Sequence, residues 1–106
     1  LINPTVTQVE PANNATGVAT SAVVKLQFSE RINPLTVNES TFFFGNANTG
    51  IRVNGSITVA ADGLSITFTP NAPLSVNTRY SVQMFNITDL AGHATSFFSA
   101  FTTGSQ

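Results

Sequence analysis

Short runs of alternating apolar and polar residues recur along the 106-residue chain, and helical periodicity is hard to find. The runs are separated by Gly, Pro, Asn and Asp, which are residue types that favour turns. This pattern predicts an all-β sandwich. The polar alternate positions further indicate antiparallel sheets, each with one solvated face.

Seven segments fit strands. They cover residues 5–10, 21–30, 41–45, 51–60, 61–70, 71–85 and 96–103. Pro11 ends the first segment because proline has no backbone N–H, and Pro70 closes the fifth. Residues 12–18 are interpreted as a turn. Asp62-Gly63 predicts a hairpin, whereas Asn54-Gly55 indicates either a tight hairpin or a bulge within a strand.

The alternation also predicts which side chains share a face. The residues expected to lie together on inward faces are Val24, Leu26, Phe28, Leu64, Ile66, Phe68, Tyr80, Val82, Met84, Phe97, Ser99 and Phe101. For the last three, the opposite phase is the alternative. Near Pro34 we expect one irregular or helical turn that places Leu35 or Val37 under the sandwich.

Three consecutive phenylalanines, at 42–44, cannot all face inward on one strand. At least one ring therefore points outward or into a bend. An outward ring is covered by a loop or a neighbouring module, or it stacks on a sugar. The same alternatives hold for Phe97 and Phe98.

Composition narrows the possible functions. Hydrophobic residues make up 42% of the chain, with nine Phe, while charged residues make up only 8% and give a net charge of −1 without runs of either sign. Nucleic-acid binding and attraction to anionic membranes need clustered Lys and Arg, so neither is expected. No apolar run is long enough to cross a membrane. The absence of cysteine excludes disulfides, thiolate metal sites and cysteine nucleophiles.

The one chemically suggestive stretch is "NITDLAGHATS", residues 86–96, which holds the only histidine. Asp89 and His93 could form a metal site, an acid–base pair or a turn. A transition-metal site needs more ligands than this chain offers nearby. We expect the turn, with Asp89 accepting backbone N–H bonds, Leu90 plugging the end of the core and Gly92 adopting a backbone shape that other residues resist. No catalytic, cofactor-binding or metal-binding residue is assigned.

Calcium is the one ion for which an alternative stays open, because it needs only oxygen ligands. The candidate carboxylates are Glu10, Glu30, Asp62 and Asp89, and no two of them lie within four residues of each other. A site would require one loop to gather Asp89 with carbonyl oxygens, or a junction with a neighbouring module. The expectation is therefore a module without a cofactor.

Five segments, taken together, resemble a known family. They are "VTQVEPANNATGV", "VKLQFSERINPLTV", "DGLSITFTPNAPLSVNTRYSVQM", "ITDLAGH" and the terminal "FTT". In this order and spacing they are similar to the bacterial immunoglobulin-like (Ig-like) domain found in S-layer proteins, and the similarity spans nearly the whole chain. The resemblance implies an immunoglobulin- or fibronectin-III-like antiparallel β-sandwich without catalytic residues. In that family an Asn usually stands where this chain has His93.

The segment "PLSVNTRYSV" also resembles the tyrosine corner of such sandwiches, in which a tyrosine hydroxyl bonds to backbone a few residues upstream. Tyr80 is the matching residue. Together with Asp89, Leu90 and Gly92 of the turn and with Phe28, Phe68 and Pro70, it forms the set of residues to which we assign structural roles.

Residues 1–106 are thus expected to form one Ig-like domain of a longer exported bacterial protein, located at the cell surface or outside the cell. The main hypothesis is a non-catalytic spacer whose partners are neighbouring domains of the same polypeptide. Its strands would hold its ends about 20 to 25 Å apart. The alternative is an adhesin-type module that binds carbohydrate or protein through loops at one pole or through exposed phenylalanines.

Overall fold

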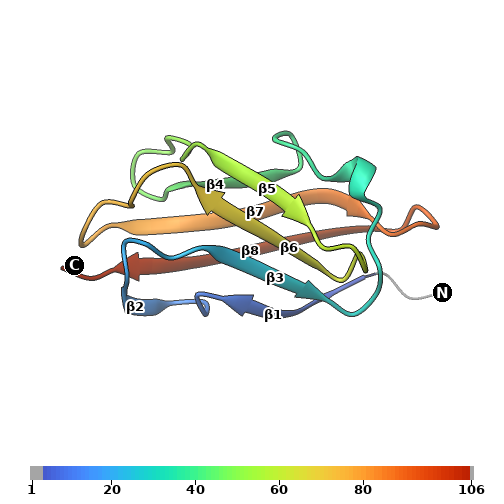
Figure 1. The fold of residues 1–106 in the computed structure, drawn as a ribbon, viewed down its shortest axis with the longest axis horizontal. Helices are drawn as coiled ribbons and strands as arrows, with labels where there is room; N and C mark the ends of the chain where they lie inside the picture. Colours follow the sequence, from blue (N-terminus) through green and yellow to red (C-terminus); the bar gives the residue numbers. More distant parts are fainter. Residues whose placement is uncertain (1–3, 106) are drawn as a thin grey trace.

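The computed structural model describes residues 4–105, which form two four-stranded sheets packed face to face (Figure 1). The strands are β1 (Val6–Glu10), β2 (Ala15–Val18), β3 (Val24–Phe28), β4 (Phe42–Asn46), β5 (Gly55–Val59), β6 (Ser65–Pro70), β7 (Arg79–Thr88) and β8 (Ala94–Thr103). One short 3-10 turn, η1 (Pro34–Thr36), precedes β4. The strand orders are β1-β3-β6-β5 and β2-β8-β7-β4. This arrangement confirms the predicted Ig-like sandwich.

The segment expected to be a turn at residues 12–18 contains β2, so the structure has eight strands where seven were predicted. After β1 the chain changes sheets, and β2 pairs with β8 in parallel, unlike every other strand pair. Only two residue pairs define this ladder, and Gly17 within it has a φ of +65°. A strand this short and irregular carries no alternation that the sequence could reveal.

The two Gly-containing turns differ. Asp62-Gly63 forms the predicted hairpin between β5 and β6, with Gly63 at a φ of +71° and Asp62 Oδ1 accepting the Leu64 N–H at 2.9 Å. Asn54-Gly55 forms neither of the expected structures. Arg52 bridges to Gly45 beside β4, whereas Gly55 begins β5 in the opposite sheet. The chain therefore passes from one sheet to the other at this point.

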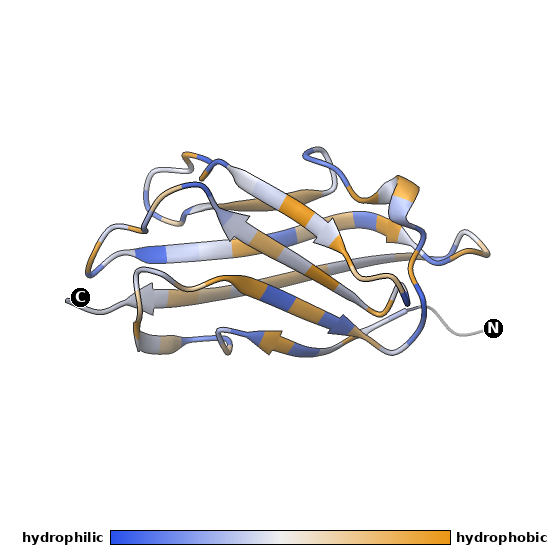
Figure 2. Ribbon diagram, viewed as in Figure 1, coloured by the Kyte–Doolittle hydropathy of each residue, from blue (hydrophilic) through white to orange (hydrophobic). Residues whose placement is uncertain are grey.

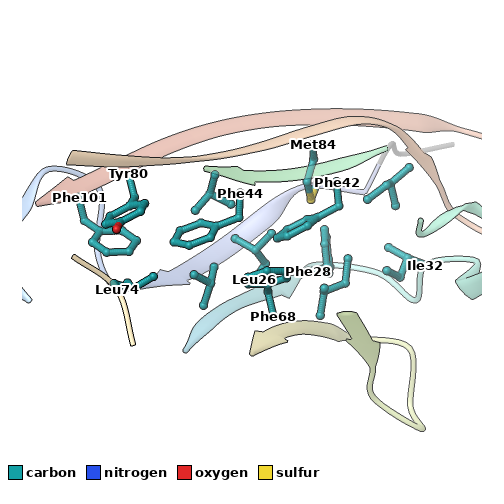
Figure 3. Close-up of a cluster of buried hydrophobic side chains, with 14 residues drawn as sticks. Leu26, Phe28, Ile32, Phe42, Phe44, Phe68, Leu74, Tyr80, Met84 and Phe101 are labelled. Carbon is teal, nitrogen blue, oxygen red and sulfur yellow. The ribbon is translucent and has the colours of Figure 1, made fainter. Parts of the chain in front are cut away.

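The core lies between the sheets, as the alternation predicted. The hydropathy colours alternate along β3 (Figure 2), where Val24, Leu26 and Phe28 are buried. Figure 3 shows the aromatic centre of this core. The ring of Phe44 lies 5.2 Å from Phe68 and 5.3 Å from Tyr80, measured between ring centroids. Such offset and tilted pairs stabilise more than their buried area alone.

Two details of the predicted core need correction. Leu64 is 41% exposed because it belongs to the Asp62 turn and lies outside β6. The predicted helical turn near Pro34 is η1, and of its two candidate core residues Val37 packs against the core while Leu35 faces solvent. The phase expected for β8 is right, because Ser99 and Phe101 are buried and Phe97 packs against the core.

The molecule is elongated, with extents of 44 × 24 × 21 Å. It is longer than the 20 to 25 Å expected because β7 and β8 have ten residues each. β1 begins at one end of the long axis and β8 ends at the other (Figure 1). Among the residues described, no helix has the length and apolar character needed to cross a membrane.

Candidate functional site

The Asp89–His93 segment forms a closed turn between β7 and β8. Asp89 Oδ1 accepts the backbone N–H groups of Ala91 at 2.9 Å and of His93 at 2.8 Å. Gly92 has a φ of +92°, a conformation that favours glycine. The segment that precedes η1 also holds the turn in place, because Asp89 forms an antiparallel bridge with the fully buried Ile32.

The two ionisable side chains of this turn contact each other. His93 Nδ1 lies 3.0 Å from Asp89 Oδ2, and the Asp89 side chain is nearly buried while that of His93 is partly exposed. The backbone N–H of His93 lowers the pKa of Asp89 most, partial burial opposes this effect, and the hydrogen bond and charge of the His93 ring lower the pKa further. Asp89 is therefore a carboxylate acceptor at neutral pH.

The expectation for Leu90 is wrong. Its side chain is 64% exposed, so it does not plug the end of the core. Ile32 and Ile87 fill that position instead, and both are fully buried. Leu90 lies in the turn between β7 and β8, directly after Asp89, and its side chain faces solvent. The sequence shows that Leu90 is apolar and follows Asp89, but this does not indicate whether its side chain points into the core or toward solvent.

Within residues 4–105, no three His, Cys, Asp or Glu side chains converge in a way that could hold a metal ion. The described hydrogen bonds of the His93 ring lead to Asp89 and to no Ser or Thr hydroxyl. Of the calcium candidates, Asp62 and Asp89 direct carboxylate oxygens to backbone N–H groups of their own turns. The chemistry that this arrangement supports is turn formation.

At the opposite end of the molecule, Tyr80 forms a tyrosine corner. Its hydroxyl accepts the backbone N–H of Ser75 at 2.8 Å, and its buried ring stacks on Phe44 and lies tilted against Phe101. Thr103 completes the corner, because its hydroxyl donates to the Ser75 carbonyl and accepts the Thr78 N–H at 2.9 Å. The sequence pattern indicated Tyr80, whereas Thr103 is one of many threonines and carried no distinguishing signal.

The remaining residues with assigned structural roles lie in the first sheet. Phe28 and Phe68 are buried in the core, and Pro70 is the last residue of β6, where it is paired with Gly55. The ring of Phe68 also packs near Phe42, at 5.7 Å between centroids. Phe28 and Phe68 thus carry the first sheet's side of the core, whereas Pro70 marks the end of β6.

The outer face of the second sheet carries the aromatic rings that the core does not use. Phe43 on β4 and Phe98 on β8 are both paired with Gln83 on β7, so the three side chains form one row across the strands. Phe98 is 60% exposed, and Phe85, two residues beyond Gln83 on the same face, is 46% exposed. The alternative hypothesis required a solvent-facing ring beside polar groups, and this face has that arrangement.

Arg52 lies over the β4 end of this row, at the edge of the sheet. Its guanidinium carbon is 4.9 Å from the centre of the Phe43 ring, and its N–H groups donate to the carbonyls of Phe42 at 3.1 Å and of Glu39 at 2.9 Å. Gly45 makes room for the Phe43 ring, because a Cβ atom at Gly45 would lie 2.5 Å from the tip of that ring. The outer face is therefore an ordered surface.

Comparison with known proteins identifies the class. Residues 2–103 match the family described as bacterial Ig-like domain (Big_5). The match covers nearly the whole chain, and the protein belongs to this family. No curated protein sequence matches the chain.

Several solved structures share the fold. Domains 1–6 of the surface layer protein SbsC align with 99% of this chain at 20% identity and a TM-score of 0.71, and the chain spans 14% of that structure. CopC from Methylosinus trichosporium OB3b aligns with 95% of this chain and 93% of its own length, at 20% identity and a TM-score of 0.79. PcoC, a methionine-rich copper resistance protein from Escherichia coli, gives 19% identity, a TM-score of 0.78 and coverage of 96% and 99%. At these identities the similarity describes the fold alone.

Proposed function

We propose that this Ig-like domain is a non-catalytic structural module that holds neighbouring parts of a bacterial cell-surface or secreted protein apart. The observation that carries the proposal is the placement of β2 and β8. β2 is the second strand of the chain and β8 the last, and the two strands run parallel to each other in one sheet. β1 begins at one end of the 44 Å molecule and β8 ends at the other, so neighbouring parts would attach at opposite ends (Figure 1).

This arrangement determines how the module resists tension. Force applied to the two ends pulls β2 and β8 in opposite directions along their common axis. Hydrogen bonds flank the pair at both ends, from the Asn14 N–H to the Ala100 carbonyl and from the Gly104 N–H to the Val18 carbonyl. Because all of these bonds connect the two strands, shear along the strand axis loads them together rather than one after another. A module loaded in this way is a stiff spacer.

The family supports the location and the partners. This chain belongs to the bacterial Ig-like family, and the surface layer protein SbsC contains a domain of the same fold to which this chain aligns over 14% of that structure. The partners under this proposal are adjacent domains of the same polypeptide, and the site of action is the exterior of the cell. The turn formed by Asp89 and the corner formed by Tyr80 close the two ends of the sandwich and have no catalytic role.

Single-molecule pulling in two directions tests the proposal. The chain has no cysteine, so one attachment point can be placed anywhere. In the first geometry the chain is pulled from its two termini. In the second it is pulled from the N-terminus and from a cysteine introduced as Asp62→Cys, in the β5–β6 turn at the end of the molecule where β1 begins (Figure 1).

End-to-end pulling should require the higher unfolding force and give a single unfolding event, because it shears β2 from β8. The second geometry pulls strands of the first sheet apart one bond at a time and should require less force. Equal forces in the two geometries, or a lower force end to end, would overturn the spacer role. The Asp62→Cys variant pulled from its termini is the control, and it should match the unsubstituted chain.

The module is further proposed to function without a bound ion. Asp62 and Asp89 use carboxylate oxygens within their own turns. We therefore expect the melting temperature to be the same in calcium and in a chelator. A rise on addition of calcium would show that a site forms around the remaining carboxylates.

A further inference from the structure

The outer face of the β2-β8-β7-β4 sheet contains a groove that the spacer role does not use. One hollow of about 310 Å³ lies beside β4 and β7, and its lining includes Phe43, Arg52 and Gln83. A second hollow of about 370 Å³ lies between β7 and β8, and its lining includes Phe98. Gln83 and Phe85 line both hollows, so the two hollows are adjacent across the strands, and together we call them the groove. Each volume is in the range of small-ligand sites.

From this groove we propose that the outer face of the sheet binds a neutral oligosaccharide. A sugar ring has an apolar C–H face and a rim of hydroxyl groups, so its site needs flat apolar surfaces beside planar hydrogen-bonding groups. Phe85 and Phe98 supply the exposed rings. Gln83, between them and Phe43, supplies an amide that both donates and accepts hydrogen bonds.

The geometry of the row fits linked sugar rings. Phe43 and Phe98 flank β7 on both sides, so their backbones are separated by two strand spacings, or about 9.6 Å. Two linked pyranose rings extend over such a distance. At the β4 end of the row, the Phe43 ring and two backbone carbonyls hold the Arg52 guanidinium in place. Its remaining N–H groups can donate to hydroxyl oxygens of a sugar. Such prior fixation lowers the entropy lost on binding.

Charge favours a neutral ligand. Arg52 and Glu39 are the only ionisable residues among those lining the two hollows, and their charges offset each other. The Arg52 guanidinium already donates to the Glu39 carbonyl. An anionic polymer would need several clustered cations. An uncharged polyhydroxylated chain matches a groove whose other walls are rings, amides and hydroxyls.

The exposed apolar area of this face is too small for the ligand to be another protein molecule. A phenylalanine side chain offers about 200 Å² when fully exposed. Phe98 at 60% and Phe85 at 46% exposure therefore present about 200 Å² together. A stable dimer buries about 800 Å² on each partner. The apolar part of this face is sized for a few sugar rings and not for a second copy of the chain.

Affinity electrophoresis tests the proposal, with the chain run in native gels that contain one soluble neutral polysaccharide each: mixed-linkage β-glucan, arabinoxylan, galactomannan or dextran. At least one polymer should retard the chain. The Phe98→Ala variant should bind that polymer about tenfold more weakly, which corresponds to the loss of one stacked ring. Gln83→Ala should weaken retardation as well, through the lost amide.

Leu35→Ala is the matched control, because Leu35 is an apolar side chain that is 88% exposed on η1, away from the groove. This variant should be retarded as strongly as the unsubstituted chain. Thermal melting of each variant establishes that it is folded.

Three results would overturn the proposal. The first is unchanged mobility of the chain with all four polymers. The second is equal retardation of the chain, Phe98→Ala and Gln83→Ala. The third is sedimentation showing self-association that Phe98→Ala abolishes, because the occupant would then be a second copy. The proposal goes beyond the spacer role, whose pulling experiment is independent of these outcomes.

Discussion

The two faces of the β4–β7–β8 portion of one sheet carry the same residue type in opposite roles. On the inner face, Phe42, Phe44 and Phe101 are completely or almost completely buried. On the outer face, Phe85 and Phe98 are exposed, and the Phe43 ring lies beneath Arg52. All six rings come from three adjacent strands. The pleat alone separates them, because successive side chains of a strand point to opposite faces.

This difference separates two contributions that an aromatic ring can make, one to the stability of the fold and one to binding. An inner ring contributes free energy of folding because its contacts are lost when the chain unfolds. An exposed outer ring changes its surroundings little on folding, so the presence of both Phe85 and Phe98 beside one hollow requires another explanation, for which we propose a ligand. Stability measurements on matched variants therefore test the comparison directly, without knowledge of the ligand.

Removing an inner ring should have the largest effect. Phe44→Ala leaves a cavity against Phe68, Tyr80 and Phe101, and we expect a loss of about 3 to 5 kcal/mol in the free energy of unfolding. Urea denaturation followed by fluorescence of Tyr80 measures it. Phe44→Leu, which keeps more of the volume, should lose less. A loss below about 1 kcal/mol for the alanine variant would contradict the proposed core.

A smaller effect is expected for the polar end of an inner ring. Tyr80→Phe keeps the stacking of Tyr80 on Phe44 but removes the acceptor of the Ser75 N–H. We expect a loss of about 1 kcal/mol, because Ser75 lies at the surface and water can reach its N–H. Thermal melting measures the change, with polysaccharide retardation unaltered. An unchanged melting temperature would count against the tyrosine corner as a source of stability.

The β7–β8 turn, beyond both sets of rings, should show a smaller and pH-dependent effect. The pKa of Asp89 is lowered chiefly by the backbone N–H of His93. Its contribution to stability is therefore complete above the unfolded pKa of about 3.9 and is lost as the pH falls through the lower folded value. Asp89→Asn should melt at a lower temperature than the unsubstituted chain at pH 7.

Melting scans at decreasing pH give the control for this turn. The difference between the unsubstituted chain and Asp89→Asn should be constant above about pH 5 and should narrow steadily below about pH 4. A difference that stays constant down to about pH 2 would show that the carboxylate charge is not what stabilises the turn.

The smallest effect on stability is expected on the outer face. Phe98→Ala should change the free energy of unfolding by less than about 0.5 kcal/mol, as is usual for exposed positions. The same urea denaturation used for Phe44→Ala measures this value. A loss above about 1.5 kcal/mol would mean that Phe98 is part of the packing, and the contrast between the two faces would not hold.

Much of the fold could be predicted because strand alternation is local. The buried positions of β3 and β7, the Asp62-Gly63 hairpin and the turn containing Asp89 and Gly92 all follow from residues close together in the sequence. The prediction was wrong where contacts with distant segments of the chain determine the local structure. β2 forms only because β8 lies beside it, and Leu90 points outward because Ile32, from another loop, already fills the end of the core.

The candidate site divides in the same way. The sequence by itself determined that three adjacent phenylalanines cannot all be buried, because a strand alternates its side chains. Only the tertiary structure decided that Phe43, Gln83 and Phe98 form one row, and that Arg52 lies over its end. These residues come from β4, β7, β8 and the chain that crosses between the sheets. Their order in space depends on strand pairing over long sequence separations, which no local pattern records.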